Sequence, residues 1–106
     1  MLRLFISQPM NGKTNEEIER VRKNAIERVK KGFPDEEVEV IDSFFKDVPD
    51  VKERGLYYLG KSLELLATAD VAYFAGGWEG YRGCRIEYRC ATEYGIAVMG
   101  EIKVRG

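Results

Sequence analysis

The chain has 106 residues, 44% of them hydrophobic and 33% charged, with 17 basic and 18 acidic side chains and a formal net charge of −1. These values are typical of one globular domain spanning residues 1–106, and they give no global reason to bind duplex nucleic acid or an acidic membrane. Histidine is absent, which excludes histidine-based triads, histidine metal ligands and the usual near-neutral proton shuttle. Acid–base or nucleophilic chemistry therefore falls to Glu, Asp, Tyr, Lys or Cys.

The N-terminal third of the chain predicts a strand followed by a helix. Residues 2–6 form a short apolar run that ends at the turn formers of residues 7–13. Thr14 and Glu17 have the spacing of a capping box, which predicts the start of a helix with Thr14 as its N-cap. Apolar residues continue at helical spacing, and Gly32 is predicted as the C-cap.

The middle of the chain predicts a second strand and a second helix. Residues 38–41 are the strand, and residues 44–55 are irregular. The second helix begins at about Val51 or Glu53 and ends at Thr68. Four of its leucines lie on one helical face: Leu56, Leu59, Leu63 and Leu66.

The last third of the chain predicts two further strands around a third helix. Residues 70–74 form a strand buried on both faces, and residues 76–83 form a loop rich in glycine. The third helix spans residues 83–94 and is closed by Gly95. Residues 96–99 are the fourth strand, with residues 102–104 as a candidate edge extension.

This alternation of strands and helices predicts an α/β three-layer sandwich. Its sheet has four strands, or five with the edge extension, and is mainly parallel, with right-handed crossovers and the three helices on both faces. In such sheets ligands bind at the carboxyl ends of the strands, near the switch in strand order. Three loops share that edge: residues 7–13, 42–50 and 75–82.

The two cysteines, Cys84 and Cys90, are predicted to be reduced packing residues. A separation of six positions on a helix turns them apart around the axis, which disfavours a disulfide. Two thiols without other soft ligands make a poor zinc site, so no metal is expected. The apolar N-terminus is too short for a signal sequence, and no run approaches the roughly 18 apolar residues of a spanning helix. We therefore expect a cytoplasmic location.

The strongest candidate site is the third loop and the helix that follows it. Its glycines allow a positive φ and let a ligand approach the backbone, and the helix N-terminus favours an anion. Glu87 lies about one turn into the helix, on its less charged face, close to the ligand edge of the sheet. The structural alternative is that Glu87 pairs with Arg22 or Arg82, or favours the helix dipole. Position alone slightly favours that alternative.

The other candidates also have structural interpretations beside the functional ones. The first loop offers hydroxyl, amide, backbone and ammonium donors without a P-loop or dinucleotide pattern, and it can equally be a plain β–α connection. Asp42 can hold a sugar hydroxyl or simply shape a turn. Trp78 and Tyr81 can stack on a base, cover the core edge or join a subunit contact. Asp70 is expected to shape the turn into the third strand.

Three segments carry a resemblance to a known family. They are residues 5–12 (FISQPMNG), residues 69–71 (ADV) and residues 83–95 (GCRIEYRCATEYG), the last with Glu87, Ala91 and Gly95 at the family's spacing. The chain resembles the nucleoside 2-deoxyribosyltransferase superfamily over nearly its whole length. That superfamily includes 2′-deoxynucleoside 5′-phosphate N-glycosidases and a small phage-associated group, which this chain resembles most.

The resemblance implies a flavodoxin-like fold, an N-glycosidic reaction, no cofactor and a homo-oligomer. It implies that Glu87 is the nucleophile on the anomeric carbon of the sugar, forming a glycosyl-enzyme that water or a second base resolves. Arg82 and Gly83 would receive a 5′-phosphate. The residues predicted to bind the nucleoside or nucleotide are Ser7, Gln8, Met10, Gly12, Asp42, Gly77, Trp78, Tyr81, Arg82 and Gly83.

Two features separate this chain from the transferases. The transferases usually have a Tyr or Phe near the first loop, where this chain has Ser7, Gln8 and Met10. They also have an Asp shortly before the Glu motif, whereas here Glu79 is the only acid between Gly76 and Glu87. Three hypotheses follow: an enzyme that cleaves or exchanges the N-glycosidic bond, a non-catalytic nucleotide-binding module, and a phage-encoded interaction protein with a vestigial pocket. The role of Glu87 discriminates between them.

Overall fold

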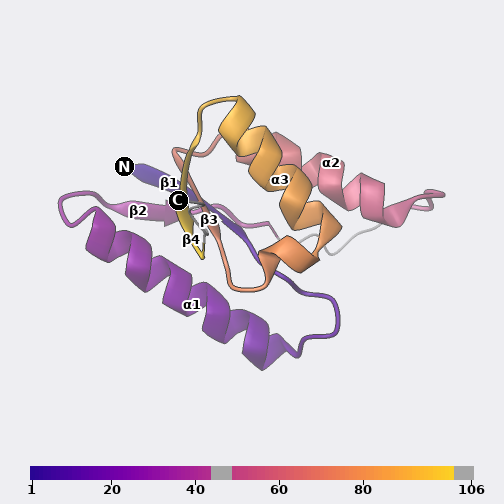
Figure 1. The fold of residues 1–106 in the computed structure, drawn as a ribbon, viewed down its shortest axis with the longest axis horizontal. Helices are drawn as coiled ribbons and strands as arrows, with labels where there is room; N and C mark the ends of the chain where they lie inside the picture. The colour runs from indigo at the N-terminus through magenta and orange to yellow at the C-terminus, as the bar shows by residue number, and fades with distance from the viewer. Residues whose placement is uncertain (44–48, 102–106) are drawn as a thin grey trace.

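The computed structural model describes residues 1–43 and 49–101. Strands and helices alternate along the chain, with a single 3₁₀ turn in the third loop (Figure 1). The strands are β1 (Leu2–Ser7), β2 (Val38–Val40), β3 (Val71–Phe74) and β4 (Ala97–Gly100). The helices are α1 (Asn15–Gly32), α2 (Arg54–Leu66), η1 (Trp78–Gly80) and α3 (Arg82–Glu93).

The four strands form one parallel sheet in the order β2-β1-β3-β4. The chain passes from β1 outward to β2 and then returns to the other side of β1, so the strand order switches between β1 and β3. Ser7 pairs with Phe74 at the carboxyl ends of these two strands. The switch point therefore lies where the first and third loops begin, which is where α/β sheets of this order bind ligands.

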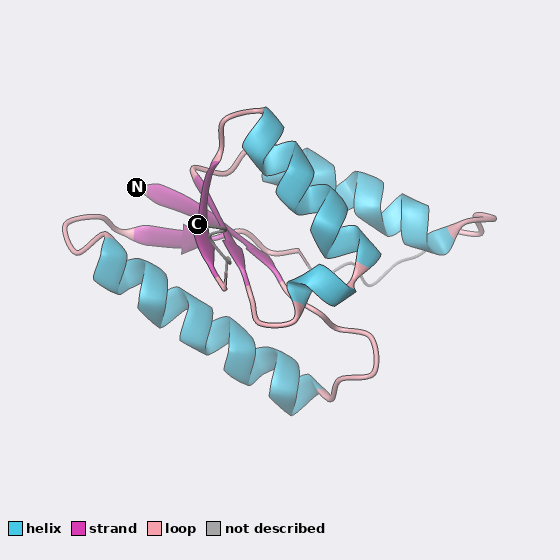
Figure 2. Ribbon diagram, viewed as in Figure 1, coloured by secondary structure: helices cyan, strands magenta, loops and turns pink. Residues whose placement is uncertain are grey.

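The helices cover both faces of the sheet, as the colouring by secondary structure makes plain (Figure 2). On one face, α1 contributes Ala25 and Val29 to a core with Leu4 and Ile6 of β1. The other face is covered by α2 and α3, whose side chains pack around Phe5 and the other residues of the second core. The fold is the predicted three-layer α/β sandwich, of flavodoxin-like strand order. The candidate extension at residues 102–104 lies outside the described residues.

The two ends of α1 test the helix caps that the sequence predicted. Thr14 caps the helix as predicted, since its hydroxyl accepts a hydrogen bond of 3.1 Å from the Glu17 amide. The predicted C-cap was wrong, because Gly32 is the last helical residue and Phe33 is the cap, with its amide bound to the Val29 carbonyl. Phe33 packs against the core below α1, which carries the helix one residue further. No helix within the described ranges is long and apolar enough to cross a membrane.

The second helix is packed less deeply than its leucine pattern suggests. Leu66 is buried and Leu63 packs against the core, but Leu56, two turns earlier, is 68% exposed. The helix also begins at Arg54, slightly later than predicted. The apolar face of α2 therefore extends past the part of the core that it covers. Gly95 does close α3, with a φ of +75° that glycine adopts readily.

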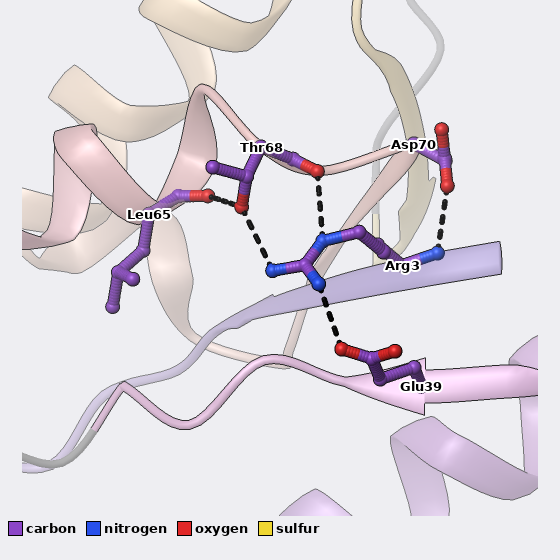
Figure 3. A network of polar contacts seen from close by, with 5 residues as sticks. All are labelled: Arg3, Glu39, Leu65, Thr68 and Asp70. Atoms are coloured by element: carbon purple, nitrogen blue, oxygen red, sulfur yellow. Dashed lines mark hydrogen bonds and ion pairs between the residues drawn. The ribbon is translucent and has the colours of Figure 1, made fainter.

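A polar network ties the amino end of β1 to its neighbours (Figure 3). The Arg3 guanidinium donates to the Thr68 carbonyl at 3.1 Å and to the Glu39 carboxylate at 2.7 Å. Asp70 accepts a hydrogen bond of 2.7 Å from the Arg3 backbone amide. Asp70 thus anchors the turn into β3, as predicted, at the end of the sheet opposite the candidate site.

Replacing Arg3 with alanine is expected to lower the free energy of unfolding by about 1–2 kcal/mol, because several hydrogen bonds to half-exposed partners are lost together. Urea denaturation measures this. The matched control is Arg89→Ala, since the Arg89–Glu93 pair is exposed and its atoms are 3.9 Å apart. That variant should lose less than about 0.5 kcal/mol. Equal losses in both variants would contradict a structural role for the network.

Candidate functional site

A buried carboxyl group marks the site. Glu87 of α3 is only 8% exposed, and its Oε1 accepts a hydrogen bond of 2.8 Å from the Ser7 hydroxyl. Ser7 is the last residue of β1 and is 2% exposed. The contact joins a helix to the carboxyl end of a central strand, next to the switch in strand order. Parallel strand order places Ser7 there, and the helical spacing of Cys84, Glu87 and Ala91 turns Glu87 toward the sheet.

The surroundings of Glu87 favour its neutral form. Burial raises the pKa of this carboxyl to about 7, while hydrogen bonds from Ser7 and Ser62 act in the opposite direction. Ser62 lies on α2, beside α3 on the same face of the sheet. At neutral pH the ionised and neutral forms of Glu87 are therefore present in comparable amounts. A carboxyl tuned in this way can serve as a nucleophile when ionised or exchange a proton with a ligand.

The alternative in which Glu87 pairs with an arginine does not hold for the part of the chain that the structure describes. No lysine or arginine there forms an ion pair with Glu87, and no basic group contributes to its raised pKa. Arg22 instead donates to the Ile41 carbonyl at 3.3 Å, and its charge interacts with Asp42. The dipole alternative is also weak, because Glu87 lies beyond the first turn of α3, where the dipole acts.

Cys84 completes a small polar cluster around this carboxyl. Its thiol is buried and hydrogen-bonds with Ser7, and burial raises the pKa of the thiol. Both cysteines are free, as predicted, which fits packing residues. A buried thiol with a raised pKa is a poor nucleophile. We call the four residues Ser7, Ser62, Cys84 and Glu87 the Glu87 cluster.

The first loop is held in place by its own backbone and by α1. The Met10 carbonyl accepts a hydrogen bond of 3.0 Å from Lys13, and Gly12 has a φ of +80°, which makes a tight turn. Gln8 is 6% exposed, and its amide nitrogen donates to the Ile18 carbonyl of α1 at 3.1 Å. The Gln8 Oε1 is buried and accepts no hydrogen bond from the described residues.

The aromatic residues of the third loop are engaged within the fold. Trp78 is buried, stacks at 4.6 Å on Tyr88 and donates its indole N–H to the Glu101 carbonyl at 2.8 Å. The structure thus favours the alternative in which Trp78 covers the core edge. The Tyr81 hydroxyl donates to the Asn11 carbonyl at 3.3 Å, which links the third loop to the first. Base binding by either ring stays a prediction.

The remaining candidates lie at the same edge, in exposed positions. Gly77 has a φ of +86°, the only left-handed glycine of the third loop, and sets the direction of the chain into η1. Arg82 and Gly83 open α3, whose N-terminus lacks a side-chain cap. Asp42 is exposed after β2. The structure therefore brings the three loops to one edge, with residues 44–48 of the second loop outside the described part.

A hollow of about 550 Å³ opens on the α1 side of this edge. The residues that line it are Pro9 and Lys13 of the first loop, Gly76 of the third loop, and residues of the first turns of α1, including Arg20. Glu87 is not among the lining residues. The hollow and the Glu87 cluster therefore lie on opposite faces of the sheet at the same end, separated by the ends of β1 and β3.

Sequence reasoning missed Ser62. The signal that could have found it is a serine within a run of leucines, at the helical position one turn before the buried Leu66. Among the described residues, no second acid contributes to the pKa of Glu87, and Glu79 is exposed, with its backbone carbonyl bound by Arg85 at 2.9 Å. No group of three potential metal-binding side chains occurs within residues 1–43 and 49–101.

The fold and the site together define a flavodoxin-like α/β domain with a buried, hydroxyl-bound glutamate at the carboxyl edge of its sheet. Comparisons of the chain with protein-family models, curated proteins and solved structures found no match. The function is therefore argued from the site itself.

Proposed function

We propose that the protein cleaves or transfers at the N-glycosidic bond of a (deoxy)nucleoside or nucleoside monophosphate, with Glu87 as the nucleophile. The observation that carries the proposal is the burial of Glu87 without a cationic partner in the described residues. Burying a carboxyl group costs stability unless it is paired or useful. The motif around Glu87, Ala91 and Gly95, and its resemblance to the deoxyribosyltransferase superfamily, supply the reaction class.

The chemistry requires the ionised form of Glu87. One carboxylate oxygen forms a bond to the anomeric carbon as the bond from that carbon to the base nitrogen breaks. The base leaves with the electron pair and takes a proton from water. Water or an acceptor base then attacks the anomeric carbon and loses a proton to the hydroxide left by the first step. The bond to Glu87 breaks, which restores the carboxylate and releases the free sugar or a new nucleoside. The Ser7 hydroxyl supports this role by donating to the carboxyl group.

The predicted binding residues divide into two groups under this proposal. Arg82 and Gly83 at the start of α3 would hold a 5′-phosphate, since the first amides of a helix favour anions. Substrate binding by Gln8 stays a prediction, because its side chain lies against α1 and its Oε1 is buried. Ser7 serves Glu87 directly, so we assign it to the carboxyl group rather than to the substrate.

The experiment is a panel of deoxynucleosides, ribonucleosides and their 5′-monophosphates, incubated with purified protein and analysed by chromatography for free base. The proposal predicts release from at least one substrate class. It also predicts transfer to a second base if an acceptor base is added. Release of base from none of them would contradict the catalytic role.

A second candidate function is a non-catalytic nucleotide-binding module. The observation that favours it is the absence of a second acid coupled to Glu87 among the described residues. Thermal-shift measurements with the same panel separate the two functions. A raised melting temperature without base release would favour the binding module. An unchanged melting temperature and no base release would favour the hypothesis of an interaction protein.

Two further expectations go with the proposal. A homo-oligomer is supported by the 68% exposure of Leu56 on the apolar face of α2. A cytoplasmic location stays a prediction from the sequence. Light scattering of the purified protein tests the first expectation.

A further inference from the structure

Two hydrogen bonds join the first loop to the beginning of α3. The inner bond is the one of 2.8 Å from the Ser7 hydroxyl to the Glu87 carboxyl group, and both of these residues are buried. The outer bond runs from the Tyr81 hydroxyl to the Asn11 carbonyl at 3.3 Å and is exposed to solvent. Residues 7–11 and residues 81–87 are therefore joined at both ends.

Tyr81 lies on the side of this pair of segments that faces the ligand edge. It is the N-cap of α3, and it packs against the same core as Cys84 and Ala91 further along the helix. Because α3 begins at the carboxyl edge of the sheet, Tyr81 is nearer to that edge than Glu87 is. The contact of its hydroxyl with Asn11 bridges the two segments there, between the edge and the buried carboxyl group.

The two ends of the first loop are held unequally. Ser7 belongs to β1, and Gln8 is fixed to α1 by its hydrogen bond of 3.1 Å to the Ile18 carbonyl. Asn11 is exposed, and its bond to Tyr81 is long for a hydroxyl donor. Local opening costs least where few, solvent-exposed hydrogen bonds hold the backbone. The outer contact can therefore open while the inner end of the loop stays in place.

Glu87 is 8% exposed, which is too little for a nucleoside to reach its carboxyl group without a movement of the cover. We propose that the contact between Tyr81 and Asn11 is a gate over Glu87. When the hydroxyl leaves the carbonyl, the tyrosine ring and the tip of the first loop separate, and the carboxyl group becomes accessible from the ligand edge. The inference rests on the proposed function only for what enters through the gate.

The test is the labelling of carboxyl groups by a water-soluble carbodiimide and glycinamide, with no nucleoside present. The carbodiimide activates a carboxyl group that it can reach, and the amine then forms an amide with that group as the activator leaves as a urea. Trypsin releases residues 86–89 as a peptide in which Glu87 is the only acidic side chain, so mass spectrometry follows its labelling directly. Glu93, exposed at the end of the same helix, is the internal standard.

Tyr81→Phe keeps the ring and removes the hydroxyl. It should raise the initial labelling rate of Glu87 about fivefold, which is the change in an opening equilibrium when one ordinary hydrogen bond is lost. Tyr81→Ala, which removes the ring as well, should raise the rate further. The labelling rate of Glu93 should be the same in every variant.

Tyr94→Phe is the matched control, because Tyr94 is 85% exposed and lies at the other end of α3. Its Glu87 should be labelled at the wild-type rate. Arg3→Ala is the second control, since it lowers the stability of the whole fold without touching the gate. An unchanged rate in Tyr81→Phe overturns the proposal. An equal rise in Arg3→Ala also overturns it, because labelling would then follow global unfolding.

The labelling reports on the gate whether or not any nucleoside is cleaved. A protein that releases no base, but whose Glu87 is labelled faster in Tyr81→Phe, would therefore contradict the proposed function and not this inference.

Discussion

Glu87→Gln is expected to lower base release by about 10³-fold or more, because an amide cannot act as the carboxylate nucleophile. The substitution keeps the size of the side chain and an oxygen that accepts the Ser7 hydrogen bond. Circular dichroism should therefore show an unchanged fold. The initial rate of base release, measured with the best substrate of the panel, gives the effect.

The matched control for this variant is Glu93→Gln, on the same helix but at its exposed end. It removes an equal charge without touching the Glu87 cluster. Base release should stay within a factor of two or so of the wild-type rate, since surface substitutions of this kind usually change little. A large loss in Glu93→Gln, or retained activity in Glu87→Gln, would contradict the nucleophile assignment.

The stability of the protein should fall as Glu87 ionises. The folded pKa of about 7 lies above the ordinary value of 4.5, so between these values the folded state binds more protons than the unfolded state. The contribution of Glu87 to stability is thus fully present below about pH 4.5 and is lost as the pH rises to about 7. The shift corresponds to about 3 kcal/mol.

Urea denaturation of the wild type and of Glu87→Gln at several pH values isolates this effect, because all other titrating groups are shared. The wild type should lose about 3 kcal/mol relative to the variant between pH 4 and pH 8. At pH 8 the variant should therefore be the more stable protein. A difference that does not change with pH would show that burial does not penalise the Glu87 carboxylate.

The sequence predicted the layers of the fold because each strand and helix carries its own local pattern. The four short apolar runs and the capping box at Thr14 depend on neighbouring residues only, and the structure confirms them. Errors occurred where distant contacts decide. Gly32 was expected to cap α1, but packing of Phe33 against the core extends the helix. Leu56 follows the leucine pattern of α2, yet the core ends before it.

The sequence predicted where the candidate site lies but not the contacts within it. Parallel strand order brings the three loops to one edge, so Ser7 and Glu87 were both expected there. Their contact was not predicted, since two residues separated by 80 positions give no local signal of a hydrogen bond. The engagement of Trp78 with Tyr88 and Glu101 likewise depends on where β4 ends. Ser62 was missed because a serine in a helix has many ordinary explanations.

The most direct test of the central claim is mass spectrometry of the protein, quenched with acid during turnover of its best substrate. The account predicts a mass increase equal to the sugar moiety, mapped to a peptide that contains Glu87 and absent from Glu87→Gln. A sugar adduct on another residue, or protein that stays unmodified while Glu87→Gln still releases base, would contradict the account.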